Sequence, residues 1–381
     1  MTDATPTTDG ARLFQPIRLG GIELANRIVV APMCQYSAKE GVPQPWHAQH
    51  LGALALSGAG LVIVEATGVE AAGRISPGDT GLWNDEQEHA FARLLTDIRT
   101  YAPARFGVQL AHAGRKASTN PPWVDKGRSL TAAEGAWTTF APSPTPQADG
   151  WPTPEALDEA GMARITAAFV QAARRADRAG FDLVELHGAH GYLIAGFLSP
   201  IANTRTDAYG GSLENRMRFP LEIAAAVRAV WPRDKALGAR LNGSDWVEGG
   251  TTPQEAADVS SRLKALGFDY VHISSGGTAQ AARIPGREPG YQLAFAEVVK
   301  AANPDLVVMA VGMIADPEQA EAVLGEGQAD MVALARAFLD DPRWGWRAAS
   351  VLGAPSPAPP QYERAAKDGW PGYALAHPGG G

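Results

Sequence analysis

The segment 187–192 reads His-Gly-Ala-His-Gly-Tyr and places two imidazoles and a phenol close together in the chain. Neutral imidazoles can donate hydrogen bonds to an oxygen that gains negative charge, and a phenol can deliver a proton. His187 and His190 could also begin a metal site, but such a site needs a third ligand, and the spacing of the other histidines marks none out. The motif alone leaves open acid–base chemistry, a metal site and a purely structural role for His187, His190 and Tyr192.

Four further polar residues, Glu65, Gln109, Glu185 and Arg240, interrupt or end apolar runs of the chain. The amide of Gln109 and the guanidinium of Arg240, if they lie near the mouth of a site, could bind a polar heterocycle or an anion. The same side chains could instead form a satisfied hydrogen-bond network. Arg336 ends another apolar run, where a phosphate ligand and an ordinary ion pair are both possible.

Cys34 is the only cysteine, so an internal disulfide and a cysteine-ligated zinc or iron–sulfur centre are excluded. Most lone cysteines are inert and buried. Cys34 ends an apolar run, but no base partner for nucleophilic catalysis is visible in the sequence.

Eight short apolar and β-branched runs must position these residues. Runs of this kind are typical of parallel strands covered by helices. They span 27–33, 61–69, 106–112, 181–187, 236–241, 270–274, 307–314 and 331–338. Their number predicts an α/β fold consisting of a single (β/α)8 TIM barrel.

Helix starts are predicted between the runs, where a capping residue precedes an amphipathic segment. These are Asn84, Thr153-Pro154, Thr252-Pro253 and Asp316-Pro317. Helix-to-strand connections are short, whereas three strand-to-helix connections, near 115–152, 193–218 and 275–291, are long. Such loops gather at the C-terminal face of a barrel, where the active site is expected.

The chain has 381 residues and a formal charge of −8, with 45% hydrophobic and 19% charged residues, which is ordinary for a globular protein. The sequence has no basic run of the kind that would predict nucleic-acid binding, and none of its apolar stretches is long enough to span a membrane. The first ten residues lack signal-peptide features, so we expect a cytoplasmic protein. We expect a disordered N-terminus (1–10), one barrel (11–353) and an irregular C-terminal segment (354–381). No Gly-x-Gly-x-x-Gly or Walker-type loop indicates a Rossmann or P-loop domain.

Taken together, several segments resemble the Old Yellow Enzyme family of FMN-dependent ene-reductases, and within it the thermophilic-like class. The resemblance runs from about Leu13 to Arg364. Its segments are Asn-Arg at 26–27, Ala-Pro-Met-Cys-Gln-Tyr at 31–36, 64–68, Gln-Leu-Ala-His-Ala-Gly-Arg-Lys at 109–116, His-Gly-Ala-His-Gly-Tyr-Leu at 187–193, Thr-Asp-Ala-Tyr-Gly-Gly-Ser at 206–212, Glu-Asn-Arg at 214–216 and 310–314.

The resemblance implies that FMN lies across the barrel mouth. One face of its ring system would contact Ala31, Pro32, Met33, Cys34 and Ala66. Gln109 and Arg240 would bind the pyrimidine, while Arg336 and backbone N–H groups near Gly312 and Ala335 would hold the phosphate. The family usually has glycine where this chain has Ala335.

The resemblance also implies the reaction. NADPH or NADH reduces the flavin, which then reduces an alkene conjugated to a carbonyl or nitro group. His187 and His190 would bind the electron-withdrawing oxygen, Tyr36 would contact it, and Tyr192 would protonate the α-carbon. Arg364 would reach into a partner's site, which implies a homodimer or a dimer of dimers, although extra residues follow it here.

Four alternatives belong to other classes. A metal-dependent barrel hydrolase would use His187 and His190 as ligands, and a non-catalytic phosphate-binding barrel would not need Tyr192. A relative with a fused iron–sulfur domain fails on cysteine count, and the hydroxy-acid oxidases lack the 187–193 segment.

Overall fold

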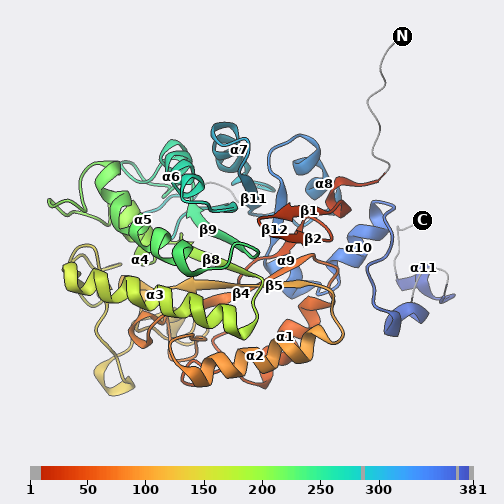
Figure 1. Cartoon of the computed structure of the whole chain (residues 1–381), viewed down its shortest axis with the longest axis horizontal. Helices are drawn as coiled ribbons and strands as arrows, with labels where there is room; N and C mark the ends of the chain where they lie inside the picture. Colours follow the sequence, from red (N-terminus) through yellow and green to blue (C-terminus); the bar gives the residue numbers. More distant parts are fainter. Residues whose placement is uncertain (1–9, 285–287, 366–368, 377–381) are drawn as a thin grey trace, which may run out of the picture.

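Eight parallel strands close into a barrel in the computed structural model, which describes residues 10–284, 288–365 and 369–376 (Figure 1). The order around the barrel is β10-β11-β12-β3-β4-β5-β8-β9, and β9 pairs with β10 to close it. The strands are β3 (Ile28–Val30), β4 (Leu61–Gly68), β5 (Arg105–Ala111), β8 (Leu183–Gly188), β9 (Ala236–Asn242), β10 (Tyr270–Ser274), β11 (Val307–Val311) and β12 (Met331–Leu334). The predicted TIM barrel is confirmed.

Helices surround the barrel and follow its strands in alternation (Figure 1). They are α1 (Pro45–Ala55), α2 (Asp85–Arg99), α3 (Glu159–Ala179), α4 (Leu193–Leu198), α5 (Leu213–Val230), α6 (Pro253–Ala265), α7 (Leu293–Ala302), α8 (Pro317–Gly325), α9 (Arg336–Asp340), α10 (Trp344–Val351) and α11 (Tyr373–Ala376). Within the described ranges, no helix is both long and apolar enough to cross a membrane.

The predicted caps at Asn84, Thr252 and Asp316 are confirmed, since each side chain accepts a hydrogen bond from a first-turn N–H group. The predicted helix start at Thr153-Pro154 is wrong. Helix α3 starts after Asp158, whose carboxylate accepts from the N–H of Gly161 at 2.7 Å. The residues after Pro154 instead form β7 (Glu155–Ala156), which pairs with β6 (Phe140–Ala141).

Three predicted strands are shorter in the structure by three residues or more. The first is confined to Ile28–Val30. The seventh ends at Val311 because Gly312 has a φ of 123°, outside extended geometry. The eighth ends at Leu334, so Arg336 does not close the strand as predicted but begins α9.

The barrel interior is apolar at its N-terminal end and polar near its mouth. A two-stranded hairpin, β1 (Ile17–Leu19) and β2 (Ile22–Leu24), packs its buried side chains against the interior cluster that includes Leu183 and Met309. The tip of the hairpin touches Asp234 and Asp269, which precede β9 and β10, so the hairpin closes the N-terminal end. The opposite end remains for a functional site.

The C-terminal segment continues from α10 into a 3-10 helix, η6 (Pro360–Ala365), and α11. Figure 1 shows this segment beside α10 at the edge of the molecule. The sequence predicts a disordered N-terminus at residues 1–10. Residues 1–9 lie outside the residues that the structure describes, so this stays a prediction.

Candidate active site

The turn that leaves β8 brings the two predicted histidines and the tyrosine together. Strand β8 ends at Gly188, and Tyr192 is the N-cap of α4. Between them His190 and Gly191 adopt left-handed backbone conformations, with φ values of 60° and 72°. The ring of His187 therefore lies 5.2 Å from that of His190 and 4.8 Å from that of Tyr192, measured between centroids.

Burial sets the protonation of these three rings. It lowers the pKa of His187 and of His190 well below the usual histidine value, and the nearby Arg240 lowers both further. It raises the pKa of Tyr192 well above that of a free phenol. At neutral pH the site thus holds two neutral imidazoles and a protonated phenol, which can donate hydrogen bonds and a proton.

Cys34 and Tyr36, which follow β3, reach the same place from another strand. Both pack with Tyr192 against a small buried cluster formed by Ile75, Ala113 and Ala117. Burial raises the pKa of the Cys34 thiol, so this thiol is protonated at neutral pH. The arrangement brings three predicted site residues from different strand ends together.

Lys116 also belongs to this site, although in the sequence it stands out only as part of the 109–116 motif. Its Nζ donates to the carbonyl oxygens of His190 at 2.7 Å and Gly277 at 3.0 Å, and lies 4.9 Å from the ring centroid of Tyr192. Asn242 also accepts from the N–H of His190 at 3.0 Å. These contacts hold the left-handed residue in place. In the sequence, the position of Lys116 in the loop just after β5, at the expected mouth of the barrel, could have indicated that it belongs to the site.

Three of the four polar strand residues lie inside the barrel. Gln109 Nε2 donates to Glu185 at 2.8 Å, and Arg240 lies opposite His187 in the strand register. All are buried. Glu65 departs from this group because the register between β4 and β5 shifts at this residue, and its carboxylate pairs with His47 of α1 at 3.1 Å.

The predicted phosphate ligands also gather at neighbouring strand ends. Val311 pairs with Ala333, so Gly312 after β11 lies beside the turn at Ala335 and Arg336 after β12. Arg336 is exposed and has no ion-pair partner among the residues that the structure describes. Its charge is available to an anion.

Buried polar atoms without a partner test whether a flavin fits this mouth. In the described part of the chain these include His187 Nδ1, Arg240 Nε and His272 Nε2, which belong to three adjacent strands in register. Buried polar atoms are normally satisfied, so these call for a polar ligand or water. A flavin pyrimidine carries carbonyl oxygens, ring nitrogens and an N–H group, and the residues present fit it.

Ala31, Pro32, Met33 and Cys34 directly follow β3, and Ala66 lies in the neighbouring β4. Arg364 is not brought to this mouth in its own chain. It is exposed in η6, and the preceding residues 357–360 line a groove with Gly58, Gly60 and Ala104, which precede β4 and β5. That groove lies at the N-terminal ends of the strands.

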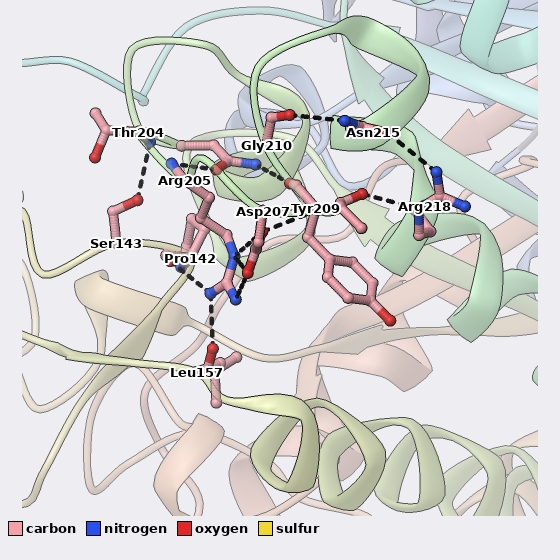
Figure 2. Close-up of polar contacts among 12 residues, drawn as sticks. Pro142, Ser143, Leu157, Thr204, Arg205, Asp207, Tyr209, Gly210, Asn215 and Arg218 are labelled. Atoms are coloured by element: carbon pink, nitrogen blue, oxygen red, sulfur yellow. Dashed lines mark hydrogen bonds and ion pairs between the residues drawn. The ribbon is translucent and has the colours of Figure 1, made fainter.

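The loop after α4 is anchored to the insertion between β5 and α3. Figure 2 shows the guanidinium of Arg205 donating to the carbonyl oxygens of Pro142 at 3.0 Å and Leu157 at 2.7 Å, and pairing with Asp207. Thr204 N–H donates to Ser143 Oγ at 2.9 Å. These contacts fix the insertion beside α4, the helix that Tyr192 caps.

No three His, Cys, Asp or Glu side chains in 10–284, 288–365 and 369–376 converge as possible metal ligands. The metal-site alternative therefore lacks a third ligand beside His187 and His190 among these residues.

Comparison with known proteins gives a consistent result. Residues 12–353 match the NADH:flavin oxidoreductase / NADH oxidase family. The chain is 42% identical over 363 residues to an NADPH dehydrogenase of Geobacillus thermodenitrificans, covering 94% of this chain and 98% of that protein. It is 40% identical over 361 residues to an NADPH dehydrogenase of Bacillus subtilis, covering 94% and 99%.

Among solved structures, morphinone reductase is similar with a TM-score of 0.76 at 30% identity, covering 92% of each chain. The family match covers most of the chain, and the buried unpaired groups at the mouth suit its flavin. The chain therefore belongs to the NADH:flavin oxidoreductase family, the Old Yellow Enzyme family that the sequence resembles, with FMN as its cofactor.

Proposed function

We propose that this protein is an NADPH- or NADH-dependent ene-reductase, which reduces the C=C bond of α,β-unsaturated carbonyl or nitro compounds. The observation that carries the proposal is the convergence of His187, His190 and Tyr192 at the end of β8. Two neutral donors and one neutral acid within a few ångströms suit an alkene activated by an oxygen. Relatives named NADPH dehydrogenase support the nicotinamide as reductant.

FMN, when bound, would supply the hydride-transfer chemistry that links the nicotinamide to the β-carbon of the alkene. Three sets of residues would hold this cofactor, and the side chains of each set match the part of FMN that they would contact. Ala31, Pro32, Met33, Cys34 and Ala66 would contact one ring face; Gln109 and Arg240 would bind the pyrimidine; and Arg336, with backbone near Gly312 and Ala335, would bind the phosphate.

His187 and His190 would bind the electron-withdrawing oxygen of the substrate. Neutral imidazoles can each direct one N–H at that oxygen, and their donation strengthens as negative charge develops there. Arg240 opposes protonation of both rings, and Ser274 Oγ holds His190 Nε2 at 2.8 Å. Tyr36, packed in the same cluster, would add a contact to this oxygen.

Tyr192 would protonate the α-carbon. Its phenol is protonated at neutral pH, and its ring is packed between His187 and the cluster that contains Cys34 and Tyr36. An acid of this kind matches a carbanion-like centre better than bulk water does.

The exposed position of Arg364 in η6 leads to a proposal about assembly. Because this segment lies away from its own mouth, Arg364 would complete the site of a partner subunit in a homodimer or a dimer of dimers.

An absorption spectrum of the purified protein tests this function. Flavin bands should bleach on anaerobic addition of NADPH and return on addition of 2-cyclohexenone. Bands that bleach but never return with enones, maleimides or nitroalkenes would refute alkene reduction while leaving the NADPH dehydrogenase activity intact.

A further inference from the structure

A buried carboxylate that the reaction does not use lies beneath the predicted pyrimidine site. Glu185 is fully buried in the middle of β8. Its Oε1 accepts from Gln109 Nε2 at 2.8 Å, and its Oε2 accepts from Tyr270 Oη at 3.2 Å and His272 Nδ1 at 3.1 Å. No lysine or arginine in the described stretches of chain pairs with it directly. A buried charge held by neutral donors is costly and calls for an explanation.

The barrel is built to make these contacts. Glu185 lies opposite Gln109 on one side and Gly238 on the other, and Gly238 lies opposite Tyr270. A Cβ on Gly238 would come within 2.1 Å of the Tyr270 ring, so glycine is required for the tyrosine to reach across β9. The phenol thereby reaches a carboxylate two strands away.

Glu185 determines which end of the Gln109 amide faces the mouth. An ionised carboxylate only accepts hydrogen bonds, so Gln109 must turn its NH2 group toward Glu185. The amide oxygen is thereby left for a ligand. An acceptor at this place suits a pyrimidine N–H group and would reject a ligand that presents only acceptors.

Glu185 also places a negative charge near Arg240. Burial by itself raises the pKa of Glu185, but His272 and Arg240 outweigh it and hold that pKa below its usual value. The carboxylate is therefore ionised at neutral pH. The guanidinium of Arg240 is always charged and has a buried Nε without a partner, so it is available to the cofactor.

We propose that Glu185 is a positioning residue for the cofactor, which orients the amide of Gln109 and offsets the charge of Arg240, thereby lowering the reduction potential of bound FMN. The inference rests on the proposed contacts of Gln109 and Arg240 with the pyrimidine. The reduced flavin carries more negative charge than the oxidised one, so a buried anion nearby disfavours reduction.

The test is the midpoint potential and the FMN dissociation constant of the Glu185→Gln variant. The neutral side chain should shift the two-electron reduction equilibrium about tenfold toward the reduced form, which is a rise of about 30 mV. FMN binding should weaken about tenfold, because an amide at 185 would let Gln109 turn and present its NH2 group to the pyrimidine N–H. An unchanged potential would overturn the charge role.

Glu185→Asp is the second variant, and it also provides a test if Glu185→Gln does not fold. It keeps the charge but draws it back from Gln109, so FMN binding should weaken while the potential stays near that of the wild type. Wild-type affinity in this variant would overturn the orienting role. Tyr209→Phe is the matched control: it removes a tyrosine–carboxylate hydrogen bond, from Tyr209 to Glu222, outside the barrel, and it should leave both quantities unchanged.

Arg240→Gln separates this inference from the proposed cofactor contacts. Removing the positive charge should move the potential in the opposite direction, downward. If Arg240→Gln changes neither potential nor affinity, the proposed placement of the pyrimidine is wrong. If Arg240→Gln lowers the potential and Glu185→Gln leaves it unchanged, only the role of Glu185 is wrong.

Discussion

Replacing Tyr192 by phenylalanine removes one oxygen atom and leaves the ring packing in place. The ring contacts with His187 and with the cluster around Ala113 do not involve the hydroxyl. FMN binding and flavin reduction by NADPH should therefore keep their wild-type values. Alkene reduction should slow, because the proton must then come from water or a less suitable group.

The expected size follows from the acidity of the two donors. A free phenol has a pKa near 10 and water about 15.7, a gap of about six units. If half of this gap is expressed in the transition state, the loss is about 10³-fold. Burial raises the pKa of Tyr192 and narrows the gap, so we expect about 10²- to 10³-fold, or about 3–4 kcal/mol.

The assay is anaerobic stopped-flow spectroscopy with the two half-reactions measured separately. Tyr209→Phe is a matched control, since this tyrosine donates to Glu222 at 3.3 Å in the loop and helix after α4 (Figure 2 shows its ring), and both half-reactions should keep wild-type rates. Wild-type rates in both half-reactions of Tyr192→Phe would show that Tyr192 is not the acid. Equal slowing of both half-reactions would point to a disturbed site rather than a lost proton donor.

Three further predictions concern residues around the site. Cys34 would contact the flavin ring but take no part in proton or hydride transfer, so Cys34→Ala should shift the flavin potential and retain turnover; loss of all activity with FMN fully bound would contradict this role. Arg205→Met leaves the Pro142 and Leu157 carbonyls without their donor, so the free energy of unfolding in urea should fall by about 2 kcal/mol and residues 115–152 should become protease-sensitive. Unchanged cleavage would refute the anchoring role. Burial lowers the pKa of Lys116 to about 8, so its charge is present below that pH and is lost above it. Alkene reduction should therefore decline as pH rises through about 8, and Lys116→Arg should extend activity to higher pH; identical pH profiles would exclude Lys116 as the titrating group.

The sequence was sufficient for the barrel and for the local part of the site. Eight apolar runs identify eight strands because parallel strands covered on both faces are apolar along their length. His187, His190 and Tyr192 lie within one strand-end turn, so their proximity follows from six consecutive residues. Caps such as Asn84 are equally local, because the side chain and the N–H that it accepts from are three residues apart.

Features that depend on several strands could not be read from one segment. The carboxylates of Glu65 and Glu185 look alike in their apolar runs, yet the register shift at Glu65 aims it at His47 of α1, whereas Glu185 lies inside the barrel. Strand register is fixed by packing around the whole barrel. A single run therefore does not reveal which face a given residue occupies.

The sequence by itself determined the fold class, the family and the proximity of His187, His190 and Tyr192, because these follow from strand periodicity and from local motifs. Tertiary structure alone decided what surrounds them. It placed His272 and Tyr270 on Glu185, set Lys116 against the His190 turn and kept Arg364 away from its own mouth. The physical reason is that such contacts join residues far apart in the chain, and only the closed barrel sets the distances between them.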